Sequence, residues 1–156
     1  MTNLIYEAFF CFISMFSFGL IFRLSFNLKF MIIASLNSVA GWSVYRLLES
    51  QGQSRYLAYF LGALTCAILG EIIARFVRAP ASIFYVIGCL PLVPGGGIYL
   101  TMLYLTDNKQ DMFLATFIDT IIISGAIAVA ILISGTFFRL FKRRKANENP
   151  WPYRRI

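Results

Sequence analysis

Five apolar stretches follow one another along the chain, and short polar or charged connections separate them. An α-helix rises about 1.5 Å per residue, so about 20 apolar residues cross the hydrocarbon core of a bilayer. Each stretch reaches about this length. We therefore predict an all-α, polytopic integral membrane protein with transmembrane helices at residues 4–22, 30–48, 56–74, 82–105 and 112–138.

The second stretch, residues 30–48, is the most polar of the five. It carries Ser35, Asn37, Ser38 and Arg46, and several of these positions share adjoining faces at a helical period. A polar stripe on a membrane helix faces other helices or a cavity. An amphipathic helix lying in the membrane interface is the alternative interpretation. The distribution of charge, described below, favours a spanning helix.

Small residues form ridges in two of the predicted helices. In the third stretch, Gly62, Cys66, Gly70 and Ala74 recur at every fourth position. In the fifth stretch, small residues stand at positions 126, 130 and 134. Such ridges allow a second membrane helix to approach closely.

The fourth stretch contains a helix-breaking segment, Pro91-Leu-Val-Pro-Gly-Gly-Gly97, near its centre. Each proline removes a backbone donor, and each glycine is unfavourable in a helix. Irregular backbone within hydrocarbon must be buried in protein or line a wet cavity. Transporters build substrate sites from such interrupted helices, whose free N–H groups and positive ends suit an anion. A kinked helix that merely packs closely is the alternative.

Two carboxylates within the predicted spans are candidates for proton coupling, because ionisable groups at membrane depth are costly. Asp119 lies beside Thr116 and Thr120 on one polar patch of the fifth stretch. It could instead be a hydrogen-bonded residue near the interface. Glu71 lies one helical turn before Arg75, so the two could form a structural ion pair.

Composition narrows the possible functions. The chain has 156 residues, of which 59% are hydrophobic and 13% charged, with no histidine and three cysteines within apolar stretches. A Ser-His-Asp triad and a His-ligated zinc are therefore excluded, and a disulfide framework is disfavoured. We expect no enzyme activity, no cofactor and no metal. Residues 1–141 form the predicted membrane domain, and residues 142–156 a basic tail that we predict to be mostly disordered.

The net charge of +7 could suggest nucleic-acid binding, but its distribution indicates a membrane topology instead. In a five-span arrangement, residues 23–29, 75–78 and 139–156 share one side and hold 11 of the 14 basic residues. The positive-inside rule makes this side cytoplasmic. We therefore predict an N-terminus outside, a cytoplasmic C-terminus, contact with membrane lipids and no nucleic-acid partner. Without a span at residues 30–48 the basic connections would be split between both sides.

Three motifs together resemble the threonine/serine exporter (ThrE) family. They are Gly19-Leu-Ile-Phe-Arg23 at the end of the first stretch, Asn37-Ser-Val-Ala-Gly-Trp42 in the second, and Pro91-Leu-Val-Pro-Gly95 followed by Tyr99 in the fourth. The proline–glycine element is the most specific of the three. The resemblance extends from about residue 5 to residue 141 and matches the short, five-span half of the transporter when it is made as a separate subunit.

The resemblance implies a larger ThrE-like membrane subunit as partner. It also implies export of small amino acids or carboxylates, such as threonine, serine or succinate, across a bacterial cytoplasmic membrane. The candidate substrate-binding residues are Pro91, Pro94, Gly95, Gly96, Gly97, Tyr99, Asn37, Thr116 and Thr120. Alternatives are a structural or assembly subunit whose partner holds the substrate, and a passive channel. A homo-oligomer also remains open.

Overall fold

A computed structural model describes residues 2–22 and 28–147, and within these residues every regular element is helical. The helices are α1 (Thr2–Ile21), α2 (Leu28–Ser50), α3 (Arg55–Val77), α4 (Ala81–Cys89), the 3₁₀ turn η1 (Leu90–Leu92), α5 (Gly95–Thr106) and α6 (Gln110–Asn147). The predicted all-α class is confirmed for this part of the chain. Helix α6 continues beyond the predicted end of the fifth span, so residues 142–147 are helical, while residues 148–156 lie outside the described residues.

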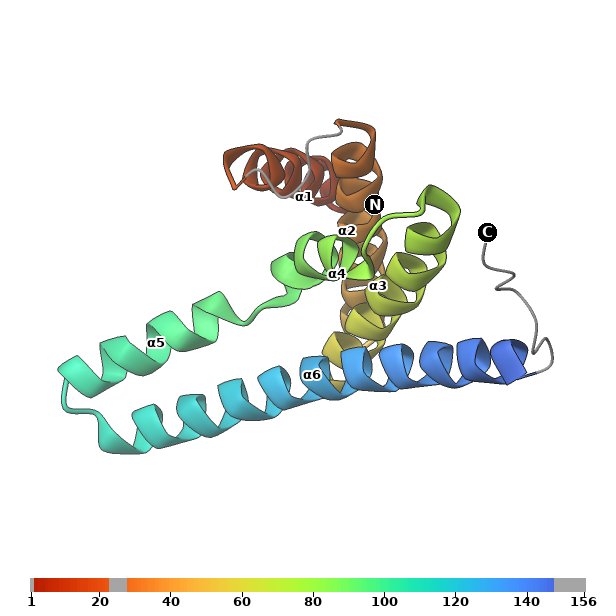
Figure 1. Cartoon of the computed structure of the whole chain (residues 1–156). Helices are drawn as coiled ribbons and strands as arrows, with labels where there is room; N and C mark the ends of the chain where they lie inside the picture. Colours follow the sequence, from red (N-terminus) through yellow and green to blue (C-terminus); the bar gives the residue numbers. More distant parts are fainter. Residues whose placement is uncertain (1, 23–27, 148–156) are drawn as a thin grey trace, which may run out of the picture.

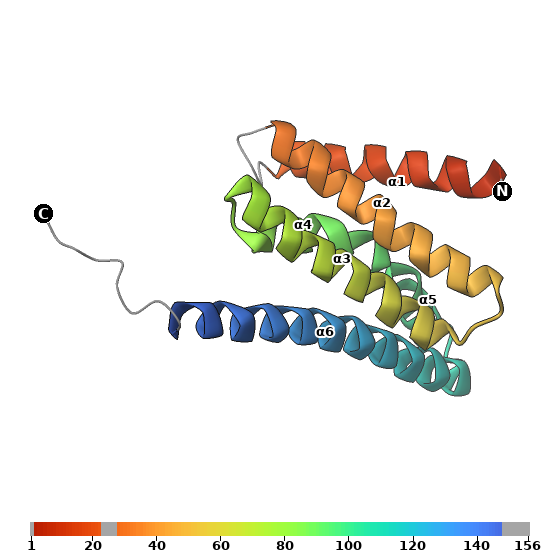
Figure 2. The same cartoon turned by 90° about the vertical axis from the view of Figure 1, so that its right-hand side faces the viewer.

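Helices α1, α2 and α3 lie side by side and alternate in direction (Figure 2). Glu7 near the start of α1 contacts Arg46 near the end of α2, while Gly19 near the end of α1 faces Met31 near the start of α2. The crossing of α2 with α3 is tight. A Cβ atom added to Gly41 would overlap the Cys66 sulfur and lie 3.0 Å from the Gly62 carbonyl oxygen. The predicted small-residue ridge of α3 is confirmed as the surface that permits this approach.

Helix α6 runs parallel to α3 along the other side of the bundle. The start of α3 contacts α6 at Asp119, and its last turn contacts α6 at Phe138. Ala130 and Ser134 of the second predicted ridge are buried. Helix α5 packs mainly against the first half of α6, and the two extend together beyond the bundle (Figure 1).

Three helices are long and apolar enough to cross a membrane, at Leu4–Ile21, Arg55–Val77 and Gln110–Leu140. A fourth candidate is the pair Ala81–Leu92 and Gly95–Thr106, whose two parts pass the test only together and are bent by 51°. The described residues therefore contain three or four candidate spans where the sequence predicted five. Helix α2 is not among the candidate spans because it is the most polar helix of the bundle. Its polar side chains are buried, since Ser35, Asn37 and Ser38 are at most 3% exposed.

Candidate functional site

The helix-breaking segment forms a junction between α4 and α5. Helix α4 ends at Cys89, the 3₁₀ turn η1 follows, and the Val93 N–H donates to the Leu90 carbonyl at 3.1 Å. Val93 and Pro94 link η1 to α5, which begins at Gly95. The sequence predicted the three glycines as part of the break. They instead form the first turn of α5, because a helix start has no preceding turn to disrupt.

The three glycines have different surroundings. Gly95 and Gly96 are exposed, and a Cβ atom added to either would meet nothing within 4 Å. A Cβ atom on Gly97 would lie 2.5 Å from the Thr120 hydroxyl oxygen, so α5 can approach α6 here only without a side chain. None of the three has a positive φ. The packing and backbone of this chain therefore explain Gly97 but neither Gly95 nor Gly96.

The start of α5 is open. Its N-cap residue is Pro94, which makes no side-chain capping bond, and the Ile98 N–H donates to the Pro94 carbonyl at 3.1 Å. The first N–H groups of an α-helix have no partner within the helix and carry a partial positive charge. Tyr99, one turn further on, is 66% exposed. The Gly95 N–H donates to the Val93 carbonyl at 2.7 Å. Among the described residues the N–H groups of Gly96 and Gly97 are therefore the open ones at this helix start, and the aromatic, hydroxyl-bearing Tyr99 follows in the next turn.

Two cavities adjoin the junction. One, of about 420 Å³, lies between α1, α2 and Pro91, and it is lined by Tyr6, Glu7, Phe10, Cys11, Ser14, Met15, Trp42 and Pro91. The other, of about 510 Å³, lies between α5 and α6, and it is lined by Ile98, Thr101, Met102, Phe117, Thr120, Ile121, Ser124, Gly125 and Ala128. The α4–α5 junction therefore separates a cavity on the α1 side from one on the α6 side.

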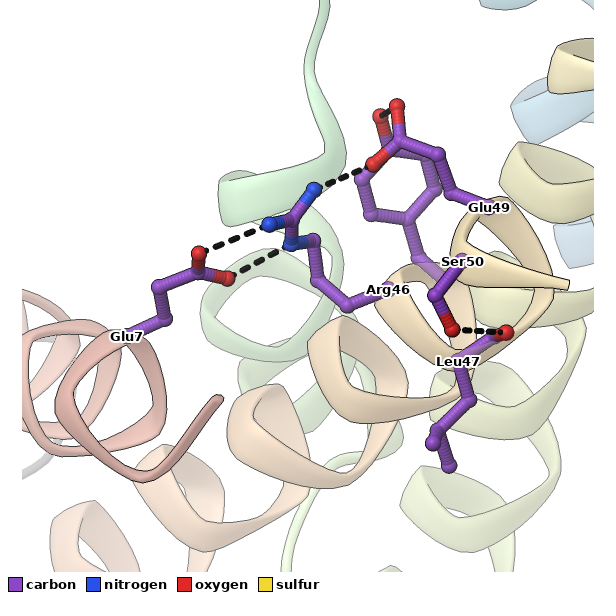
Figure 3. Close-up of polar contacts among 6 residues, drawn as sticks. Glu7, Arg46, Leu47, Glu49 and Ser50 are labelled. Atoms are coloured by element: carbon purple, nitrogen blue, oxygen red, sulfur yellow. Dashed lines mark hydrogen bonds and ion pairs between the residues drawn. The ribbon is translucent and has the colours of Figure 1, made fainter. Parts of the chain in front are cut away.

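Glu7, which lines the first cavity, belongs to a cluster of charged side chains (Figure 3). The Arg46 guanidinium donates two hydrogen bonds to Glu7, at 2.6 and 2.8 Å, and a third to Glu49. Glu49 also accepts from the Tyr45 hydroxyl at 3.0 Å. Sequence reasoning missed this cluster as a site, although a carboxylate and a guanidinium within apolar stretches were visible signals.

Asn37 lies in the bundle interior. Its side-chain amide donates to the Cys66 carbonyl of α3 at 3.1 Å and to the Phe84 carbonyl of α4 at 3.3 Å. A Cβ atom on Gly88 would lie only 2.6 Å from the same nitrogen. Asn37 therefore joins three helices, although its buried side-chain oxygen has no hydrogen-bond partner among the residues that the structure describes.

The polar patch of α6 is divided between two neighbours. The Thr120 hydroxyl donates to the Thr116 carbonyl at 2.7 Å and faces Gly97 of α5. The Thr116 hydroxyl also donates within α6, to the Met112 carbonyl. Asp119 points to α3, where it accepts from the Tyr56 hydroxyl at 2.7 Å and from Arg55 at 3.3 Å. Only Thr120 of this patch is therefore in contact with the α4–α5 junction.

Glu71 lies at the opposite end of α3 from Asp119. It forms an ion pair with Arg75 at 3.7 Å and accepts a hydrogen bond from the Tyr85 hydroxyl of α4. Arg75 in turn stacks on the Phe138 ring of α6, 4.4 Å from its centroid. The two carboxylates singled out in the sequence are thus each engaged by neighbouring helices and do not lie together.

No curated protein and no solved structure matches this chain. A family model described as "Threonine/Serine exporter, ThrE" matches residues 7–137, a range that includes the proline–glycine junction and every candidate residue named above. The apolar helices agree with a membrane protein, and the matched family is one of transporters. The chain belongs to the threonine/serine exporter family.

Proposed function

We propose that this chain is one membrane subunit of an exporter of small amino acids or carboxylates, and that a separate, larger membrane subunit completes the transport path. The observation that carries the proposal is the open start of α5. The fold of this chain would tolerate a side chain at Gly95 and at Gly96, yet both positions are glycine. Both are exposed at a helix start whose amides suit a carboxylate. Something outside this chain therefore accounts for the two glycines.

In this proposal the carboxylate of the substrate binds the amides of Gly96 and Gly97, since the Gly95 N–H is bonded to the Val93 carbonyl. Pro91 and Pro94 hold the junction, Gly97 sets α5 against Thr120, and Tyr99 offers a hydroxyl one turn away. Asn37 and Thr116 stabilise the helices and do not contact the substrate in this proposal, because their polar groups bond to backbone within the bundle or within α6. The partner subunit closes the exposed side of the junction.

The proposed topology has five crossings of the cytoplasmic membrane, with the N-terminus outside. Helix α2 counts as a crossing because it packs antiparallel to α1 on one side and α3 on the other, from Glu7–Arg46 at one end to Gly19–Met31 at the other. The pair α4–α5 counts as one bent crossing, since α4 begins beside the last turn of α3 and α5 ends beside the start of α6. Epitope tags on the two termini should be accessible from opposite sides.

The decisive experiment compares Gly96→Leu with Gly97→Leu. Export of threonine or succinate is followed in cells that also make the co-purifying larger subunit. We expect Gly96→Leu to abolish export while the protein inserts and unfolds at the parent temperature, because its side chain meets open space in this chain. Gly97→Leu should lower export and stability together. Normal export by Gly95→Leu and Gly96→Leu would exclude the site.

A structural subunit is the second candidate, and the same observation bears on it. Two exposed glycines could also admit a helix of the partner rather than a substrate. In that case Gly96→Leu would release the larger subunit during purification. In the leading proposal the complex stays intact and only export is lost. A passive channel would instead show export that follows the concentration gradient without any driving ion.

A further inference from the structure

A third cavity, of about 260 Å³, lies at the far end of the bundle from Glu7 and Arg46. It is an open cavity lined by the last turns of α3, the start of α4, and α6 at Phe138 and Arg139. Figure 2 places this end of the bundle beside the C-terminal end of α6. Its walls combine two arginines with small residues such as Ala81, which leave the space between the helices unfilled.

The charges that line this cavity do not cancel. Glu71 is already satisfied, because it pairs with Arg75 and accepts from the Tyr85 hydroxyl. Arg75 is held in place by stacking on Phe138 and by a 3.4 Å hydrogen bond to the Phe138 carbonyl. Arg139 makes no ion pair within the described part of the chain. The cavity therefore carries a surplus positive charge beside an already positioned guanidinium.

The opposite end of the bundle lacks this surplus. There, Arg46 pairs with Glu7 and Glu49, and Arg55 pairs with Asp119. Lys109, in the α5–α6 connection, pairs with Asp107. Acidic side chains of this chain thus neutralise the basic side chains at that end. The α3–α4–α6 cavity instead keeps a net positive charge, which would attract an anion.

We propose that the cavity between α3, α4 and α6 binds the phosphate group of an anionic phospholipid. Guanidinium groups match a phosphate through paired, charge-assisted hydrogen bonds. Basic pockets between membrane helices at the cytoplasmic surface bind lipid headgroups. Arg75 and Arg139 flank the phosphate, Phe138 and Ala81 contact the glycerol portion, and the acyl chains run along the apolar outer surface of α6. The site rests on the proposed topology, which puts this end of the bundle at the cytoplasmic surface, and it is independent of the transported substrate.

Native mass spectrometry of the purified full chain tests the site, with phosphatidylglycerol and phosphatidylcholine as probes. We expect the parent to retain phosphatidylglycerol preferentially. Arg139→Gln should weaken that binding about fivefold, the effect of one arginine near a membrane surface. Ala81→Leu keeps every charge but fills the cavity, and it should remove the preference.

Arg78→Gln is the matched control, because it removes the same charge from the same end, and Arg78 does not line the cavity. We expect it to bind phosphatidylglycerol as the parent does. Equal losses in Arg78→Gln and Arg139→Gln, together with parent-like binding by Ala81→Leu, would overturn the proposal in favour of general surface charge. Arg139 is exposed, so its variant should fold, and unfolding temperatures of all three variants verify this.

Competition with inorganic phosphate identifies the source of the phosphate group. If millimolar inorganic phosphate leaves phosphatidylglycerol bound, the acyl chains contribute and the ligand is the lipid. If it displaces the lipid in the parent and no longer binds in Arg139→Gln, the phosphate site stands but its ligand is soluble phosphate. Absence of any preference for phosphatidylglycerol over phosphatidylcholine in the parent would refute the site outright.

Discussion

The glycines of the α1–α4 bundle and those at the start of α5 differ in what surrounds them. In the bundle, Gly41, Gly62 and Gly88 each stand where an added Cβ atom would press on a neighbouring helix. At the start of α5, Gly95 and Gly96 face open space. Glycine is costly in a helix, by about 1 kcal/mol relative to alanine. Close packing offsets that cost in the bundle, whereas Gly95 and Gly96 gain no such contact from the described residues.

The largest effect is expected at the α2–α3 crossing. Gly41→Ala places a methyl group against the Cys66 sulfur, which is held by hydrogen bonds to the Asn37 and Gly88 carbonyls. The methyl group also presses on the Gly62 carbonyl, and this backbone cannot shift without moving α3. We expect a loss of about 3 kcal/mol in the free energy of unfolding, the upper part of the overpacking range. Reversible unfolding in mixed micelles measures it.

Gly125→Ala is the matched control for Gly41→Ala. A Cβ atom at Gly125 of α6 meets nothing within 4 Å, so the substitution only improves helix propensity. Its stability should stay equal or rise by up to about 1 kcal/mol. A Gly41→Ala protein as stable as its Gly125→Ala counterpart would mean that α2 and α3 are further apart than described.

Asn37→Ala is the next test, because it removes the bundle's central polar contact. Loss of the bonds to the Cys66 and Phe84 carbonyls should cost about 1–2 kcal/mol of unfolding free energy. Transport per folded molecule should stay near the parent value, since the side chain is 3% exposed and lies inside the bundle. If Asn37→Ala kept the parent stability but lost transport, Asn37 would belong to the substrate site.

The contrast between glycines also shows what could be predicted from sequence. The α3 ridge was predictable, because small residues at every fourth position of one helix indicate close contact with another helix. Gly95, Gly96 and Gly97 are indistinguishable in sequence. What separates them is Thr120, 23 positions beyond Gly97, whose hydroxyl fills the space beside only one of them.

Long-range polar pairs were unpredictable for the same reason. Glu7 and Arg46 were visible as charges in apolar stretches, but their pairing depends on the register of α1 against α2. Asp119 looked like a candidate for proton coupling at its depth in α6, and its partners Arg55 and Tyr56 come from the start of α3. Sequence periodicity indicates which face of a helix is polar and leaves open which helix that face meets.

Gly97→Ala sharpens the comparison within the α5 start itself. Its methyl group would press on the Thr120 hydroxyl, 2.5 Å away, and should cost about 1–2 kcal/mol of unfolding free energy. Gly96→Ala, the adjacent control, should cost nothing. Thr120→Ala removes the clashing hydroxyl, so the double variant Gly97→Ala/Thr120→Ala should recover about 1 kcal/mol of coupling free energy. Additive losses in this cycle would show that α5 does not rest on Thr120.

The smallest effect is expected for Asp119→Asn. Asp119 pairs with Arg55, whose side chain is 61% exposed, and exposed ion pairs contribute at most about 1 kcal/mol. Asparagine can still accept from the Tyr56 hydroxyl, so much of the α3–α6 contact persists. Because both partners lie at the start of α3, away from the α4–α5 junction, we expect an unchanged pH profile of export.

Asp111→Asn is the control for lost charge, because Asp111 is an acidic residue in the first turn of α6. If the pH profile of export shifted in Asp119→Asn but not in Asp111→Asn, Asp119 would take part in proton transfer.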